Sequence, residues 1–136
     1  MHKSKLAGFI IDCRTADLEA AARFWSDALG MELRHLPGAE GDKYVQLLDR
    51  QHGLHVEVQS VSHPSRVHLD IETDDIEAEV ARLEGLGAKQ VERVHGWCVM
   101  EAPTGQRFCV VRKSAVNFDA AANQWPDPGQ GLGRAR

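Results

Sequence analysis

Residues 11–20, IDCRTADLEA, and residues 69–78, LDIETDDIEA, are two copies of one pattern. At a constant offset of 58 residues, Asp, Thr, Asp, Glu and Ala are identical at their paired positions. A stretch of helical periodicity that ends in Leu-Gly follows each copy, at 29–30 and at 86–87. Self-similarity at a fixed period predicts a duplicated supersecondary module. We expect two such half-domains to leave a cleft where they meet.

Both halves of the chain show the same order of elements. An apolar, β-branched run predicts a strand at the start of each half, at 6–13 and 66–71. Helices are predicted over 17–29 and 75–86, the second beginning with a capping-box pattern at Asp74-x-x-Glu77. Three strands follow each helix, at 32–36, 43–48 and 54–59 in the first half and at 89–93, 97–101 and 107–112 in the second. Each half is therefore predicted to be β-α-β-β-β.

The short linker between the halves predicts one domain over residues 1–113, built from modules at 5–60 and 64–113. A C-terminal tail over 114–136 has no counterpart in the repeat. Its Gly-rich end, 129–136, is expected to be disordered. The tail also carries Phe118 and Trp125, large apolar side chains that we expect to dock on the chain's own body or on a partner subunit.

Composition narrows the class of protein. The chain has 136 residues, 43% hydrophobic and 26% charged, with a net charge of −4, and no segment concentrates basic residues. Nucleic-acid binding therefore has no electrostatic support. No apolar run is long enough for a signal sequence or a membrane span. Three cysteines without CxxC spacing suit a reducing compartment, so we expect a cytoplasmic protein without nucleic-acid or membrane partners.

Several motifs carry a resemblance to a known superfamily. They are FW at 24–25, RVHLD at 66–70, GW at 96–97 and the sequence GQRFCV at 105–110, which follows an Ala-Pro-Thr turn. In this order and spacing the chain resembles the vicinal oxygen chelate superfamily, and most of all the bacterial glyoxalase-like domain proteins. The resemblance implies an α+β fold in which two tandem βαβββ modules form paired, curved mixed sheets. It does not by itself imply one activity.

In catalytic members of this superfamily, a divalent metal is held by the first and last strands of each module. When these metal-binding positions are carried over one at a time, the resemblance implies that they fall at Ile10, Glu57, His68 and Cys109 here. Ile10 has no donor atom, so the implied metal site is a degenerate one of Glu57, His68 and Cys109. All three residue types bind zinc. The cofactor is accordingly expected to be either none or a single divalent metal.

Other site candidates come from the residues themselves. His68 breaks the repeat, because its partner in the first module is the apolar Ile10. It is the candidate catalytic residue and a candidate ligand contact. Asp12 and Asp70 share its strand face by period-two alternation, either as ligand contacts or as residues that satisfy the module's own backbone. Tyr44 and Trp97 occupy matching strand positions and are ligand contacts if they face the cleft.

Three functions remain open from the sequence. The first is a metal-dependent enzyme of glyoxalase, lyase, isomerase or dioxygenase type with a degenerate metal site. The second is a metal-free protein that binds or sequesters a small molecule in the same cleft. The third is a metal-free enzyme that uses His68 as acid or base. All three take a small-molecule ligand, and we expect the protein to be a homodimer.

Overall fold

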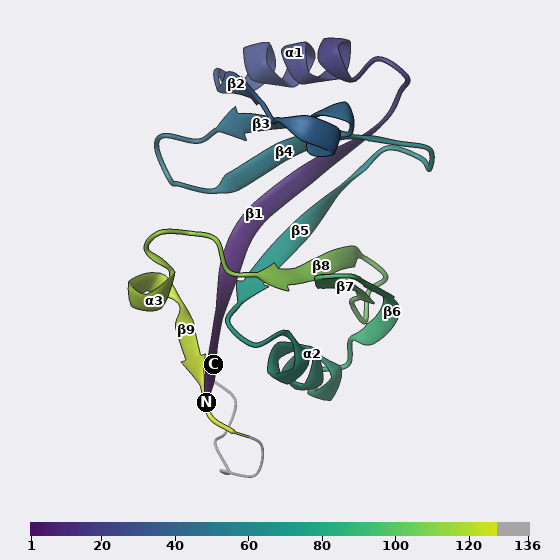
Figure 1. The fold of residues 1–136 in the computed structure, drawn as a ribbon. Helices are drawn as coiled ribbons and strands as arrows, with labels where there is room; N and C mark the ends of the chain where they lie inside the picture. The colour runs from purple at the N-terminus through teal and green to yellow at the C-terminus, as the bar shows by residue number, and fades with distance from the viewer. Residues whose placement is uncertain (128–136) are drawn as a thin grey trace. The chain divides into compact units, whose positions relative to one another are not determined.

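Each copy of the repeated motif ends a strand and begins a helix in the computed structural model of the chain (Figure 1). Strand β1 (His2–Arg14) precedes α1 (Leu18–Leu29), and β5 (Arg66–Thr73) precedes α2 (Ile76–Gly85). The structure describes residues 1–127. The remaining strands of the two modules are β2 (Glu32–His35), β3 (Tyr44–Leu48), β4 (His55–Val61), β6 (Lys89–Val94), β7 (Trp97–Glu101) and β8 (Arg107–Arg112).

The two helices begin in the same way. The side chain of Asp17 accepts a hydrogen bond from the Ala20 N–H, and that of Asp75 accepts one from the Ala78 N–H, both at 3.0 Å. The amide of each aspartate donates in turn to the threonine hydroxyl two residues earlier, at 2.9 and 3.1 Å. The repeat therefore conserves a helix cap.

The capping-box prediction at Asp74 was wrong by one residue. Asp75 caps α2, whereas the Asp74 carboxylate accepts the N–H of Lys3, at 2.8 Å. The misassignment arose because two aspartates stand in a row, and the one that caps the helix is the one that pairs with Asp17 in the repeat.

The chain divides into two units. Residues 8–69 form the N-terminal unit, and residues 1–7 with 70–127 form the described part of the C-terminal unit. Strands β1 and β5 contribute one end to each unit. Within the N-terminal unit the strand order is β2-β3-β4-β1-β5, and within the C-terminal unit it is β6-β7-β8-β5-β1. The first four strands of each list repeat one topology, as the duplicated sequence predicts.

In the N-terminal unit, alternation places apolar side chains of β1, β3 and β4 under α1. Strand β4 runs parallel to β1 and antiparallel to β3. The buried residues of this core are Ile11, Ala22, Val45, Leu47, Val56 and Val58. The other face of the same strands is left for polar residues.

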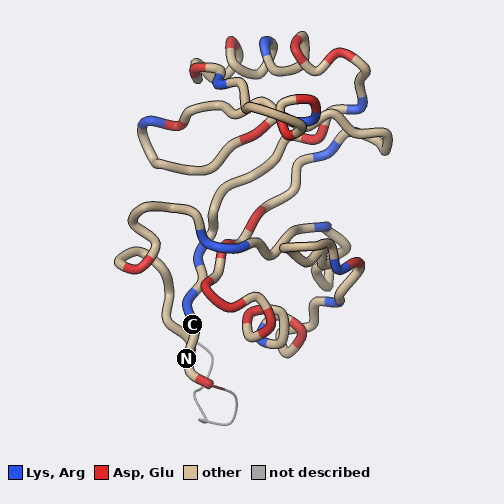
Figure 2. Tube along the Cα trace, in the orientation of Figure 1, with Lys and Arg blue, Asp and Glu red and all other residues tan. Residues whose placement is uncertain are grey.

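The C-terminal unit has the equivalent core under α2. Its buried residues are Val80, Leu83, Cys98, Met100 and Val110. Because Cys98 and Met100 face α2, the alternating Trp97 and Val99 of β7 face away from it. Figure 2 shows acidic residues at the start of α2, where Asp74, Asp75 and Glu77 lie.

The tail docks on the chain's own C-terminal unit as far as the structure describes it. Strand β9 (Asn123–Trp125) pairs antiparallel with the first residues of β1, after a short helix α3 (Phe118–Ala121). Phe118 is buried. The indole N–H of Trp125 donates to the Ser4 hydroxyl at 2.8 Å, and the Arg82 guanidinium lies 3.8 Å from the centroid of its ring. The predicted disorder at 129–136 lies outside the described residues.

Pairing with β9 also explains why β1 begins four residues before the predicted strand. Residues 2–5 have no continuous apolar run, so the sequence pattern does not predict a strand there. The fold class is nevertheless the predicted one: α+β, mostly sheet, with a helix packed on one face of the strands in each module. Within residues 1–127, no helix has the length and apolar character that crossing a bilayer requires.

Candidate functional site

The N-terminal unit carries a row of polar side chains on the sheet face opposite α1. We call this the polar face and define it by Ile10, Asp12, Tyr44, Gln46, Glu57, Gln59 and His68. The strand register sets its arrangement. Asp12 stands opposite Gln59, and Gln59 opposite Tyr44, while Ile10 stands opposite Glu57. None of these side chains is exposed, although all but Ile10 are polar.

His68 and Asp12 form a close polar contact on this face. The Nδ1 atom of His68 lies 2.7 Å from Oδ2 of Asp12, and their side chains are 13% and 1% exposed. An ionised carboxylate only accepts hydrogen bonds, so His68 Nδ1–H is the donor. The carboxylate thus fixes the tautomer of the imidazole and directs its chemistry to Nε2. Asp12, predicted as a ligand contact or a structural residue, holds the predicted catalytic histidine in place.

Arg66 is the third member of this group. Its Nε lies 3.8 Å from the same Asp12 oxygen, and its side chain is 45% exposed. Because it stands two residues before His68, it lies on the same face of β5. Arg66 was not predicted as a site residue, although the same period-two alternation places it on the face of His68.

Tyr44 faces away from the α1 core and is part of the polar face. Its hydroxyl oxygen accepts a hydrogen bond from the side-chain amide of Gln59, at 3.1 Å. Gln59 is a second residue that sequence analysis missed. What marks Gln59 is that it is polar and stands opposite Asp12. The sequence does not show this pairing, because the register of two strands far apart in sequence is set only by the fold.

The predicted metal-site residues are divided between the two units. Glu57 and His68 belong to the N-terminal unit and Cys109 to the C-terminal unit, so the predicted set of Glu57, His68 and Cys109 stays a prediction. Ile10, the first implied position, is buried and offers no donor. Its register partner Glu57 has a carboxylate oxygen 3.2 Å from Nε2 of His55.

A different pair of potential metal donors lies close together in the C-terminal unit. Asp70 on β5 and Cys109 on the neighbouring strand β8 bring a carboxylate oxygen and a thiol sulfur within 4.8 Å of each other. Carboxylate and cysteine are both zinc ligands, so these two donor types fit part of a divalent metal site.

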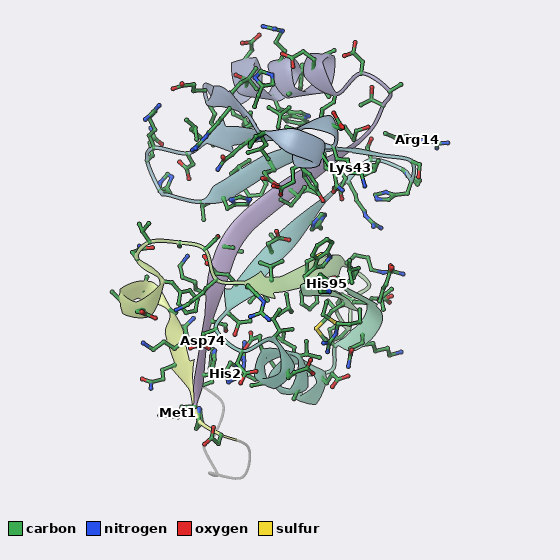
Figure 3. All side chains as sticks on the ribbon, in the orientation of Figure 1. Met1, His2, Arg14, Lys43, Asp74 and His95 are labelled. Atoms are coloured by element: carbon green, nitrogen blue, oxygen red, sulfur yellow. The ribbon has the colours of Figure 1, made fainter. Side chains whose placement is uncertain are left out.

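The C-terminal unit also contains an open cavity of about 560 Å³. Trp97 is the one predicted site residue in its lining. The other lining residues are Asp74, Asp75, Ile76, Glu77, Arg93, Val94, His95, Gly96 and Arg112, two of which, Asp74 and His95, are labelled in Figure 3. Charges of both signs line it, and Arg93 pairs with Glu77 at 2.5 Å. The cavity therefore has no marked preference for ligands of one charge.

Comparison with known proteins identifies the family. Residues 8–111 match the glyoxalase-like domain family. The chain belongs to this family. The glyoxalase-like domain is part of the vicinal oxygen chelate superfamily, as the sequence motifs of the two modules predicted. No curated protein matches the chain in sequence.

Solved structures share the fold of this glyoxalase-like domain at low sequence identity. Methylmalonyl-CoA epimerase from Mycobacterium tuberculosis is 16% identical with a TM-score of 0.60, over 85% of this chain and 91% of that one. A hypothetical protein from Bacillus halodurans is 14% identical with a TM-score of 0.60, over 82% and 95% of the two chains. A mutant 4-hydroxymandelate synthase from Streptomyces coelicolor is 12% identical with a TM-score of 0.51, and the match spans 84% of this chain and 50% of the synthase. These likenesses establish the fold, and a fold hosts many functions.

Proposed function

We propose that this glyoxalase-like domain protein binds a small carbonyl compound on the polar face and moves a proton on it, as an isomerase or lyase does. The observation that carries the proposal is the 2.7 Å contact between His68 Nδ1 and Asp12 Oδ2. A histidine whose tautomer is fixed by a buried carboxylate presents Nε2 as a proton acceptor and later as a donor. Epimerisation, the reaction named for several of the structural relatives, is a proton transfer of this kind.

The asymmetry of the repeat supports a functional role for His68. The modules agree at Asp12 and Asp70 and at both helix caps, but they differ at Ile10 and His68. Packing of the module does not require a polar residue at this position, because the sibling module uses isoleucine there. An imidazole placed there needs a partner, and Asp12 supplies one.

The test measures proton exchange and binding together. Methylmalonyl-CoA and a panel of small 2-oxo compounds are incubated with the protein in D2O, and exchange of the carbon-bound proton is followed by NMR. His68→Gln should reduce exchange by about 10²-fold or more. His68→Ile should preserve or raise stability and weaken probe binding by about tenfold, equivalent to about 1.4 kcal/mol.

The matched control is His52→Gln, because His52 lies in an exposed turn of the same unit with a side chain that is 72% exposed. Exchange by the wild type that survives in His68→Gln would contradict the proposal. Binding without any exchange would favour a metal-free binding or sequestering protein, which is the alternative function.

A second candidate function is that of a metal-dependent enzyme. It is favoured by the short distance between the Asp70 carboxylate and the Cys109 sulfur. When bound, a divalent metal would polarise a substrate oxygen, and Asp70 and Cys109 are residues of the C-terminal unit that would hold it. Elemental analysis of the purified protein separates the classes. We expect well under one metal per chain; about one zinc per chain that is lost in Cys109→Ser would establish the metal-dependent class instead.

A further inference from the structure

The open cavity of the C-terminal unit is a second place where a small molecule can bind. Its volume of about 560 Å³ falls within the range of ~300–1,000 Å³ that is typical of small-molecule sites. Three segments line it: the start of α2 at 74–77, the connection from β6 to β7 at 93–97, and Arg112 at the end of β8. None of these residues belongs to the polar face, so a ligand here is additional to the proposed substrate.

One pair of charged side chains in the lining is already neutralised. Cys98 packs under α2, and its register partner Arg93 lies on the same face of the strands. The two Nη atoms of Arg93 contact the two carboxylate oxygens of Glu77, at 2.5 and 3.2 Å. This ion pair joins β6 to α2 and leaves neither charge available to a ligand.

Arg112 is a cation of the lining whose guanidinium is available. It stands two residues after Val110, which is buried under α2, so it lies on the α2 side of β8. Arg112 is exposed, and no carboxylate of residues 1–127 forms an ion pair with it. A guanidinium presents its N–H donors in a planar fork that matches the two oxygens of a carboxylate. The ligand group that complements Arg112 is therefore a carboxylate.

Asp74 and Asp75 supply the opposite charge. Each accepts one backbone N–H through Oδ1, from Lys3 at 2.8 Å and from Ala78 at 3.0 Å. The second carboxylate oxygen of each aspartate makes no hydrogen bond within residues 1–127. Both residues are exposed and line the cavity, so these oxygens are accessible to ammonium groups.

The charges that remain available exclude the simplest ligands. Apart from the internal ion pair there are two carboxylates and one guanidinium, and His95 adds no negative charge. A simple anion would meet an excess of negative charge, and a simple amine would leave Arg112 without a partner. A ligand with two ammonium groups and one carboxylate matches the lining group for group.

We propose that this cavity binds a basic amino acid such as lysine or ornithine. Its carboxylate pairs with Arg112, and its two ammonium groups pair with Asp74 and Asp75. The methylene chain between them lies against the apolar residues of the lining, which are Ile76, Val94 and Trp97.

The experiment compares lysine with two analogues that each lack one of its charged groups. Cadaverine is lysine without the carboxylate, and ε-aminocaproate is lysine without the α-ammonium group. Calorimetric titration measures affinity, and NMR shifts of the amides of residues 93–97 locate the binding. Because contacts between exposed charges contribute up to about 1 kcal/mol each, the wild type should bind lysine about fivefold more tightly than either analogue.

Two variants assign these preferences to their residues. Arg112→Gln should bind lysine no better than cadaverine. Asp74→Asn, which keeps an oxygen for the Lys3 N–H, should lower the affinity for lysine to about that for ε-aminocaproate. The matched controls are Lys89→Gln and Glu92→Gln, which remove one charge of each sign at exposed positions of β6 and should leave both preferences unchanged.

The inference is overturned if the wild type does not bind lysine at millimolar concentration, or if it binds either analogue as tightly as lysine. An affinity for lysine that is unchanged in Arg112→Gln or in Asp74→Asn would also contradict it. The proposed function is tested separately, because His68 lies outside this cavity. His68→Gln should therefore bind lysine as the wild type does.

Discussion

Individual polar residues in the interior of this protein are held by neighbours from distant parts of the sequence. Glu79, fully buried on α2, accepts hydrogen bonds from Nε and Nη2 of Arg82 at 2.9 and 2.8 Å and lies 2.7 Å from Nε2 of His2. Figure 3 labels His2 close to α2, at the start of β1. Burial opposes ionisation of Glu79, but the hydrogen bonds from Arg82 and His2 outweigh it and hold the pKa of this carboxyl below its usual range.

Glu72 is a second carboxylate of this type. Burial again opposes ionisation, and the N–H groups of Ser114 and Ala115, together with Lys5, outweigh it and lower the pKa of Glu72. This contact also fixes the beginning of the tail. Both carboxylates therefore stabilise the C-terminal unit in their ionised form.

Glu79→Gln should lower the free energy of unfolding by about 1.5–3 kcal/mol at pH 7, because Arg82 and His2 lose their charged acceptor. The pH dependence follows from the lowered pKa. A carboxyl whose pKa is lower folded than unfolded stabilises fully above its unfolded value, near 4.5, and loses this contribution as the pH falls through its folded pKa. Glu79→Gln should therefore show a shallower loss of stability as the pH falls below about 5. Urea unfolding over this range measures both effects.

The control for this prediction is Glu92→Gln, at an exposed position on β6 of the same unit. It should change stability by no more than about 0.5 kcal/mol. A Glu79→Gln variant with the stability and acid dependence of the wild type would show that the buried carboxylate contributes nothing net.

At the scale of elements, the pairing of β1 with β4 depends on one close backbone approach. A Cβ atom added at Gly8 would lie 1.9 Å from the carbonyl oxygen of His55, the residue opposite it in the parallel ladder. No side chain can give way here, because the contact is with backbone. The β1–β4 pair also sets the register of Asp12 with Gln59, so the polar face depends on this approach.

Gly8→Ala should destabilise the N-terminal unit by about 1–3 kcal/mol or more, since β1 and β4 must separate to admit the methyl group. Gly85→Ala, at the end of α2, is the matched control. Nothing lies within 4 Å of its added Cβ, and the better helix propensity of alanine should stabilise by up to about 1 kcal/mol. Thermal unfolding should give a lower melting temperature for Gly8→Ala and a slightly higher one for Gly85→Ala than for the wild type. A Gly8→Ala variant as stable as the wild type would be inconsistent with this close approach.

At the scale of the whole molecule, exposed apolar side chains indicate how the chain assembles. The tail's Trp125 and Phe118 contact the chain's own C-terminal unit, so they are not the apolar residues that need a partner. Val67 and Leu69 are better candidates. They lie on one face of β5 in the N-terminal unit and are 58% and 52% exposed.

We propose that the protein is a homodimer that covers this apolar pair, because adjacent large apolar side chains on a strand are seldom left to solvent. Light scattering should give twice the chain mass for the wild type and the single-chain mass for Leu69→Glu. Val116→Glu, at a position that is fully exposed, should remain dimeric. A wild type that is monomeric at all concentrations tested would refute the proposal.

The sequence by itself determined the repeat, the order of elements and most of their boundaries. Strands 97–101 and 107–112 match prediction at both ends, and both helices agree within two residues. These features are local. Period-two and 3.6-residue patterns record which side of an element is buried, and a cap such as Asp17 hydrogen-bonds within its own first turn.

Only the tertiary structure decided which polar residues meet. Asp12 and His68 are 56 residues apart, and nothing in either strand's own pattern shows that Nδ1 of one lies 2.7 Å from the carboxylate of the other. The same holds for Gln59 with Tyr44 and for β9 with the first residues of β1. Such contacts depend on the register between strands, which arises from packing of the whole sheet and from backbone hydrogen bonds that are indifferent to side-chain identity. A sequence pattern fixes the face on which a residue lies, whereas register fixes its neighbour across the sheet.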